Sequence, residues 1–414
     1  MHLDQSKIEI LFQKEWKFIG MVYYGRSGSF FLQSILDGHP QIVALPPQIN
    51  NIYNRTVYDR KRDVFRKTFT CSSLLKIFDP VIKHCLWNVG EESAAKSGPS
   101  RFYGENRDIF FSYDYSLFTT IFQELMMIAA GGKLVVQRKM IFLGLFFAYA
   151  LMTGKSVDDL LYTEYLMHQI HTPIKNEVRA LKEDFPHFIY LVSGREPISG
   201  LISHIQAYND MRDVQYFTQG AYNWCVLAAL DEVLNGAVVY DFLDKDHCRV
   251  VKNEYLHIYQ EDYVRSLLDY LGLPWSDMCG KSTVDGEIFW WRFGDQYKTG
   301  FNRNYKWKLC DKPYASCKDK RFFSALLKDR YEAWNYAGCP NASFDIDVFL
   351  KEGFDFFETL RLSPYIRQAF TEKIVTYYQN SYGREKNYIP PLECGDYEKK
   401  QTLVCNFLSK RSSL

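Results

Sequence analysis

The sequence lacks three features that would assign it quickly to a class of protein. The charges balance, with 50 Lys and Arg against 49 Asp and Glu, so the whole chain has no basic footprint for nucleic acid. None of the ten cysteines forms a CxxC pair or a His/Cys cluster with zinc-site spacing, which favours reduced thiols and predicts no metal. Any anion-binding site must therefore be local.

A long apolar run is the third missing feature. The most apolar segment, MIFLGLFFAYALM (residues 140–152), has 13 residues, too few to span a bilayer but enough for a buried helix. The first residues, MHLDQSKIEILFQKEW, are too polar for a signal peptide. We therefore expect a cytoplasmic protein with no transmembrane segment.

Strand and helix patterns alternate along much of the chain. Residues 17–24 (KFIGMVYY) have the pattern of a buried strand, a glycine-rich turn follows, and FFLQSILDG continues as a helix. Further strands are expected at IVAL, HFIYLVSG and CRVVKNEYL, each with a helix nearby, and residues 116–170 are expected to be helical. This alternation predicts an α/β fold with a P-loop-type parallel sheet flanked by helices.

The expected domain organisation follows from the same pattern. Residues 1–305 are predicted to form one α/β domain with a helical insertion at about 50–165. Residues 306–414 are predicted to form a helical, aromatic-rich region packed on that domain.

The turn after the first strand has the composition of a phosphate-binding loop. Glycines before a helix N-terminus let a phosphate approach unpaired N–H groups. Residues 20–27, GMVYYGRS, match the Walker A spacing except that Arg26 stands where lysine is usual. A tight turn with glycines needed only for packing is the structural alternative.

The longer stretch YGRSGSFFLQSILDGHP resembles the 5′-phosphosulfate loop of sulfotransferases, which use 3′-phosphoadenosine 5′-phosphosulfate (PAPS). The matching residues are Arg26, Ser27, Gly28, Ser29 and Phe31. Phe30 departs from the pattern, because the family usually has Ser or Thr there, but its backbone N–H is retained. The resemblance implies that these residues hold the phosphosulfate and that Arg26 neutralises charge on the leaving group.

A second stretch, YLVSGREPISGLISHI (residues 190–205), resembles the 3′-phosphate motif of the same family. Arg195 follows a predicted strand and Ser203 comes eight residues later, as the motif requires. Glu196-Pro197 replaces the more common Asp-Pro. The resemblance implies that Arg195 and Ser203 bind the 3′-phosphate of PAPS, and arginine suits a forked contact with phosphate.

A general base is predicted from the His-x-Pro motif of small-molecule sulfotransferases. His171 begins such a motif 24 residues before Arg195, and His168 is a nearby competitor. Because some carbohydrate sulfotransferases use a glutamate, Glu164 and Glu177 remain as alternatives. Proton removal requires a base within hydrogen-bond reach of the acceptor hydroxyl.

Basic residues are also expected near the nucleotide. The segment STVDGEIFWWRFGDQYKTGFNRNY lies where the family has a loop over the nucleotide, so Lys298 and Arg303 are candidate ligands of the 3′-phosphate. The acceptor is open: a hydroxyl or amine of a carbohydrate, a lipid or a small molecule.

Two other functions fit parts of the pattern. A P-loop kinase or NTPase would use GMVYYGRS with Mg-ATP and would need an acidic residue such as Asp241 for the metal. A nucleotide-binding protein without catalysis would keep the sheet, and the departure at Phe30 is where loss of chemistry would show.

Overall fold

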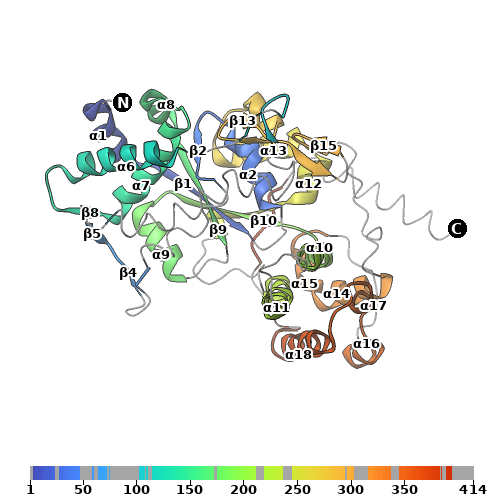
Figure 1. The fold of residues 1–414 in the computed structure, drawn as a ribbon. Helices are drawn as coiled ribbons and strands as arrows, with labels where there is room; N and C mark the ends of the chain where they lie inside the picture. Colours follow the sequence, from blue (N-terminus) through green and yellow to red (C-terminus); the bar gives the residue numbers. More distant parts are fainter. Residues whose placement is uncertain are drawn as a thin grey trace.

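The computed structural model describes residues 3–23, 28–46, 58–59, 64–71, 74, 102–107, 109–110, 114–171, 175–210, 219–235, 245–293, 296–302, 316–336, 345–382, 384 and 388–393. Its centre is a five-stranded, all-parallel sheet in the order β11-β10-β1-β9-β2 (Figure 1). These strands are β1 (Lys17–Tyr23), β2 (Ile42–Ala44), β9 (Tyr165–His171), β10 (Phe188–Gly194) and β11 (Cys248–Lys252). The predicted α/β fold class is confirmed.

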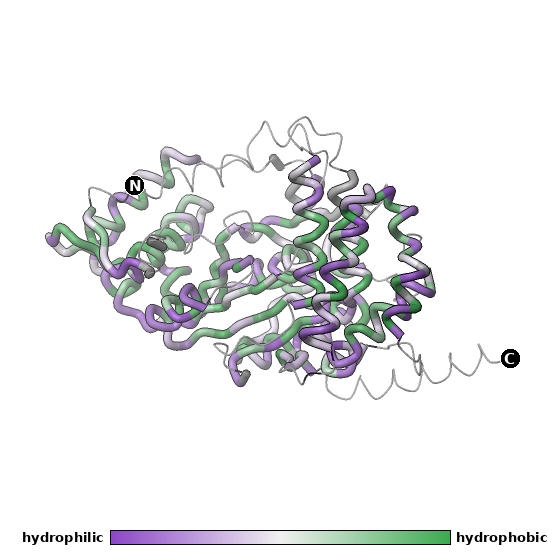
Figure 2. The backbone as a smooth tube through the Cα atoms, turned by 90° about the horizontal axis from the view of Figure 1, so that it is seen from below, coloured by the Kyte–Doolittle hydropathy of each residue, from purple (hydrophilic) through white to green (hydrophobic). Residues whose placement is uncertain are grey.

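Both faces of the sheet are covered, because alternate residues of each strand point to opposite sides. On β1, Phe18 and Val22 belong to the larger hydrophobic cluster, whereas Ile19 and Met21 belong to the smaller one. Figure 2 shows hydrophobic segments along the strands and along the helices that pack on them. The sheet is therefore the middle layer of three.

The smaller cluster holds α2 (Ser29–Asp37), α12 (Asn253–Ile258) and α13 (Glu261–Leu271) against the sheet. The larger one holds most of the other helices. These are α1 (Gln5–Gln13), α6 (Tyr115–Ala130), α7 (Arg138–Met152), α8 (Val157–Tyr162), α9 (Lys175–Asp184), α10 (Pro197–Asp210), α11 (Gln219–Asn235), α14 (Cys317–Leu326), α15 (Lys328–Ala333), α16 (Ile346–Glu352), α17 (Asp355–Thr359) and α18 (Pro364–Ser381). The apolar run at 140–152 is the buried part of α7, as expected.

Three local predictions are wrong. Residues 135–137 and 165–170 were expected to be helical with the rest of 116–170, but they form the strands β8 (Val135–Gln137) and β9, and β9 pairs with both β1 and β2. Residues 253–256 were expected to continue the strand at CRVVKNEYL, but they begin α12. The segment YLMHQIH carries two histidines and a glutamine, so its polar residues hide the apolar pattern of a buried strand. A strand that is buried on both faces tolerates such residues only through specific local contacts.

The remaining strands are short and lie in two-stranded antiparallel pairs outside the central sheet. The pairs are β3 (Tyr58–Asp59) with β4 (Val64–Phe65), β5 (Thr68–Thr70) with β8 (Val135–Gln137), β6 (Phe102–Tyr103) with β7 (Ile109–Phe110), β12 (Thr283–Val284) with β13 (Glu287–Ile288), and β14 (Trp291–Phe293) with β15 (Gln296–Lys298). Within the described ranges, no helix combines the length and apolarity needed to cross a membrane.

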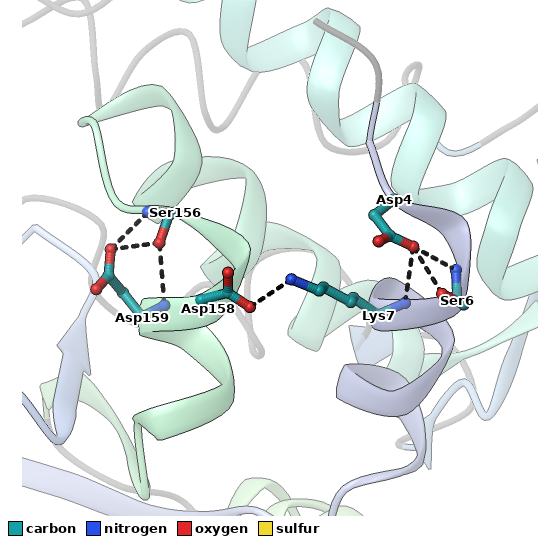
Figure 3. A network of polar contacts seen from close by, with 6 residues as sticks. All are labelled: Asp4, Ser6, Lys7, Ser156, Asp158 and Asp159. Carbon is teal, nitrogen blue, oxygen red and sulfur yellow. Dashed lines mark hydrogen bonds and ion pairs between the residues drawn. The ribbon is translucent and has the colours of Figure 1, made fainter.

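The helices α1 and α8 are capped and joined by side chains at one end of the molecule (Figure 3). Asp4 Oδ1 accepts from the N–H groups of Ser6 and Lys7, at 3.1 and 3.3 Å. Ser156 and Asp159 form a capping box at the start of α8. Lys7 Nζ lies 2.7 Å from Asp158, but such exposed pairs contribute little to stability because water screens them.

The C-terminal helices gather at the opposite end, beyond α10 and α11 (Figure 1). Asp319 fixes two of them together, because its oxygens accept from the N–H groups of Asp355 and Phe356 at 3.0 and 3.1 Å. Past α18 the chain returns to the sheet, where Leu392 N–H donates to the carbonyl of Val250 at 2.8 Å. This contact covers the outer edge of β11, which would otherwise expose unpaired backbone groups.

Replacing Gly20 in the middle of β1 should destabilise the sheet. An added Cβ would lie 2.4 Å from Cζ of Phe188, so Gly20→Ala should cost about 1–3 kcal/mol of unfolding free energy. In α10, no heavy atom lies within 4 Å of a Cβ added at Gly200, so Gly200→Ala should gain about 0.5–1 kcal/mol. Urea unfolding measures both, and equal effects would contradict the packing described here.

Candidate functional site

The carboxyl ends of four parallel strands meet at one edge of the sheet. The register aligns Tyr23 of β1 with His171 of β9, and Gly194 of β10 with Lys252 of β11. The glycine-rich loop, the His-x-Pro segment and Arg195 each continue from one of these ends. The structure therefore brings the predicted sites to one edge, which is where open α/β sheets bind ligands.

The glycine-rich loop enters α2 through Gly28. Arg26 and Ser27 lie outside the described residues, but Gly28 is the N-cap of α2 with φ of +93°. A Cβ at Gly28 would lie only 2.2 Å from Oδ1 of Asn253, the first residue of α12. Both the backbone conformation and this close approach require glycine, so Gly28 is packed tightly against the residue that follows β11.

The first residues of α2 face inward. Ser29 is buried, and the Phe31 ring stacks on His257 of α12 with centroids 4.4 Å apart. The Phe30 ring meets Phe289 edge-on at 5.2 Å. The side chain at the position that departs from the family pattern is thus a packing contact. A helix does not pair its own first N–H groups, and those of α2 begin at this edge of the sheet, which is the geometry of an anion-binding helix N-terminus.

Arg195 directly follows β10 and is partly buried. The next residue, Glu196, caps α10: its oxygens accept from the N–H groups of Ile198 and Ser199 at 3.3 and 2.8 Å. Glu196 is fully buried and also accepts from the hydroxyl of Tyr331. Glutamate in place of the usual aspartate therefore has a local structural role, which fixes where α10 begins relative to Arg195.

A cavity of about 40 Å³ lies beside Arg195, between β10, α10, α11 and α15. Its lining includes His204, Glu232 and Arg330. Ser203 lies on α10 and is partly exposed, but it is not among the described lining residues. The structure thus puts Ser203 near the strand end on the expected helix, on a different face from His204.

The two histidines of β9 have different surroundings. His168 is buried in the middle of the strand, beside Gly20 of β1. His171 ends the strand with a side chain that is 38% exposed, and its Nε2 lies 3.4 Å from Oε1 of Glu232. Of these two, His171 is the one that a substrate at the sheet edge could reach.

The two alternative glutamates are less well placed. Glu164 precedes β9 and pairs with Lys17 at 2.7 Å, at the amino end of the sheet. A strand of seven residues separates it from the site by roughly 20 Å. Glu177 is 1% exposed on α9, and its charge contributes to the raised pKa of Tyr190 in β10. Glu164 is therefore remote from the carboxyl edge, whereas Glu177 lies in the first turn of α9, just after the carboxyl end of β9, but is buried.

The segment with the predicted basic residues reaches the same edge. Lys298 ends β15, and Arg303 lies outside the described residues. Between them, the N–H of Asn302 donates to Nδ1 of His257 at 3.2 Å. His257 therefore contacts two parts of the site: Asn302, which precedes Arg303, and Phe31 of α2, the helix that follows the glycine-rich loop.

His257 and Glu254 feel the charge of Arg195. Burial, and secondly the positive charge of Arg195, lower the pKa of His257 to about 4, so its ring is neutral at pH 7. Burial raises the pKa of Glu254, and the charge of Arg195 opposes that rise. Arg195 is therefore close to α12, and α12 connects the predicted sites.

The sequence analysis missed four residues of this edge: Glu232, Asn253, Glu254 and His257. Glu232 lies on a helix that reads as ordinary buried sequence, and Asn253 and Glu254 were assigned to a strand that ends at Lys252. Only the fold brings these residues and His257 to the strand ends. In the described part of the chain, no three His, Cys, Asp or Glu side chains gather in a way that could hold a metal ion.

No protein-family model matches the sequence, and no curated protein matches it significantly. Solved structures similar to the chain are sulfotransferases. The sulfotransferase domain from the curacin biosynthetic pathway is 14% identical, with a TM-score of 0.33, over 65% of this chain and 78% of that one. The sulfotransferase domain of the Synechococcus PCC 7002 olefin synthase is 14% identical, with a TM-score of 0.34, over 66% and 78%. A sulfotransferase from Mycobacterium tuberculosis H37Rv is 11% identical, with a TM-score of 0.31, over 67% and 72%.

The neutral state of His257 predicts a pH-dependent loss of stability. Its folded pKa of about 4 lies below the unfolded value of 6.5, so the unfolded chain binds the proton first as pH falls. The stability difference between wild type and His257→Gln should therefore shrink by about 3 kcal/mol between pH 7 and pH 4. Urea unfolding at both pH values measures it, and a constant difference would show that His257 is not buried as described.

Proposed function

We propose that the chain is a sulfotransferase that moves the sulfuryl group from PAPS to a hydroxyl or amine of an acceptor. One observation carries the proposal. Gly28 at the start of α2, Arg195 before α10 and His171 at the end of β9 are far apart in sequence but lie at the same edge of one sheet. The motif resemblance identified these positions separately, and the fold unites them.

The residues at this edge have the chemistry that PAPS requires. The N-terminus of α2 offers backbone N–H groups to the 5′-phosphosulfate, together with Arg26 and Ser27 of the loop. Arg195, with Ser203, Lys298 and Arg303, is proposed to bind the 3′-phosphate, the group that separates PAPS from ATP. No metal ion is part of this proposal.

The proposed reaction is a direct transfer. The acceptor oxygen forms a bond to sulfur while the bond between sulfur and the bridging oxygen of the 5′-phosphate breaks. The acceptor proton passes to His171, and 3′,5′-adenosine bisphosphate leaves. As in phosphoryl transfer, the protein contributes mainly positioning and stabilisation of the charge that develops on the leaving oxygen, here by Arg26 and the α2 N-terminus.

The acceptor is proposed only as a class: a hydroxyl or amine of a carbohydrate, a lipid or a small molecule. The partial exposure of the His171 side chain, 38%, leaves the base accessible from outside the nucleotide site.

Binding of the nucleotide product tests the proposal. We expect 3′,5′-adenosine bisphosphate to bind tightly in EDTA and ATP to bind weakly in calorimetric titrations. Arg195→Ala should weaken bisphosphate binding by about 1.5–3 kcal/mol, because it removes a charge-assisted contact. Arg265→Ala is a matched control, since Arg265 of α13 is exposed and its guanidinium lies 3.9 Å from the centre of the Trp275 ring.

The other outcomes have clear meanings. Binding of ATP that requires Mg²⁺ and ignores the 3′-phosphate would replace the proposal with a P-loop kinase or NTPase. Binding of neither nucleotide would favour a protein without catalysis. An unchanged affinity in Arg195→Ala would reject the role of Arg195 alone.

The role of His171 has its own test. His171→Ala should leave bisphosphate binding intact and lower turnover by about 10² to 10⁴, because it removes only proton transfer. Turnover is followed as transfer of ³⁵S-sulfuryl from PAPS to water and to a panel of alcohols, phenols, amines and sugars. If the variant keeps full turnover, another group is the base.

A further inference from the structure

The described structure contains a cluster of two histidines and one glutamate beside the proposed site. Glu232 lies on α11, and its carboxylate is held between a strand end and a neighbouring helix. Oε1 lies 3.4 Å from Nε2 of His171, and Oε2 lies 3.7 Å from Nδ1 of His204 on α10. Nothing in the sequence motifs points to Glu232, because α11 reads as an ordinary buried helix.

The burial of the three side chains is graded. His171 is 38% exposed, Glu232 is 14% exposed and His204 is 9% exposed. The Glu232 carboxylate is therefore largely shielded from water. Of its two histidine neighbours, His204 is buried and His171 is partly exposed to solvent. A shielded carboxylate interacts more strongly with a histidine than an exposed one does.

The carboxylate is not an isolated buried charge. Glu232 lines the same small cavity as Arg195 and Arg330, and His204 forms part of the wall between them. These positive groups offset its charge, which is what a partly buried carboxylate requires.

We propose that Glu232 is a positioning residue for His171. It accepts a hydrogen bond from Nε2–H and so fixes the tautomer in which Nδ1 is unprotonated. This inference rests on the proposed function, because it assigns Nδ1 as the atom that takes the acceptor proton. In the transfer step, the acceptor proton moves to Nδ1, Nε2 keeps its own proton, and the carboxylate stays ionised beside the imidazolium.

His204 has a supporting part in this arrangement. Its Nδ1 lies 3.7 Å from the second carboxylate oxygen, so the carboxylate of Glu232 sits between two imidazole rings. As in other histidine–carboxylate pairs, the carboxylate orients the ring and does not take the proton itself.

Glu232→Gln tests this role with two readouts. The first is the tautomer of His171, observed through the ¹⁵N shifts of histidine-labelled full-length protein at pH 8, with the His171 signals identified from His171→Asn. Wild type should show protonated Nε2, and the variant should shift toward protonated Nδ1, because the new amide can donate to Nε2. The second is ³⁵S-sulfuryl transfer, which should fall about ten- to a hundredfold with bisphosphate affinity unchanged.

The neighbouring residue supplies a matched control. Asp231 precedes Glu232 on α11 and pairs with Lys373 at the surface, at 2.6 Å. Asp231→Asn removes one carboxylate from the same helix but should leave both the tautomer and the transfer rate unchanged. An equal effect in the control would indicate a general loss of charge or of helix stability and would overturn the proposal.

The outcomes separate this inference from the function it rests on. If wild type and Glu232→Gln bind the bisphosphate equally and show the same His171 tautomer, the positioning role is overturned and the sulfotransferase proposal stands. If wild type does not bind the bisphosphate, the proposed function fails, and with it the role of Nδ1 in transfer.

Discussion

The proposed site depends on two buried carboxylates, which fix the backbone at the carboxyl edge of the sheet. Glu196 and Glu254 are at most 1% exposed, and the N–H of Glu196 donates to Oε1 of Glu254 at 3.0 Å. Removing a carboxylate from water costs several kcal/mol unless donors replace the lost solvent. The donors here are the first N–H groups of α10 and the hydroxyls of Tyr331 and Tyr336. Arg195 lies between Gly194, the last residue of β10, and Glu196. The hydrogen bonds of Glu196 and Glu254 therefore fix the position of the Arg195 backbone.

The donors explain why the C-terminal region packs on the sheet. Tyr331 lies in α15 and Tyr336 follows that helix, so this segment brings both hydroxyls to the buried carboxylates. Lys252, which is fully buried at the end of β11, depends on the same segment. Its Nζ donates to the carbonyl of Trp334 at 2.8 Å and lies 3.6 Å from the centre of the Tyr255 ring. The aromatic residues of the tail are thus part of the structure that supports the strand ends.

Much of the fold was predictable because its signals are local. The strand before the glycine-rich loop, α2, α10 and β10 follow from apolar periodicity and turn residues in adjacent positions. Strand β9 was not predictable in this way. His168 and Gln169 give it the appearance of a polar segment, and their burial depends on neighbours from other parts of the chain. Its position between β1 and β2 is a long-range fact of topology.

The same division applies to the site. Gly28, Arg195 and His171 stood out because motif spacing is a property of the sequence itself. Glu232 and His257 did not, because what distinguishes them is a neighbour in space: His171 for the first, and Phe31 with Arg195 for the second. The apolar pattern of a helix predicts which face is buried, but it does not predict which side chains from other parts of the fold will contact that face.

The two histidines of this edge show how burial can separate structural from chemical roles. His257 is held by a backbone N–H and the ring of Phe31, and its burial, and secondly the charge of Arg195, keep its pKa low and its ring neutral. A group whose pKa is near 4 cannot exchange protons efficiently at neutral pH. His171 is more exposed, and its Nε2 lies 3.4 Å from a carboxylate oxygen of Glu232. If one histidine of this edge accepts a proton from an acceptor, its surroundings make His171 the better base, and they make His257 a fixed element that joins the loop, Arg195 and the residues before Arg303.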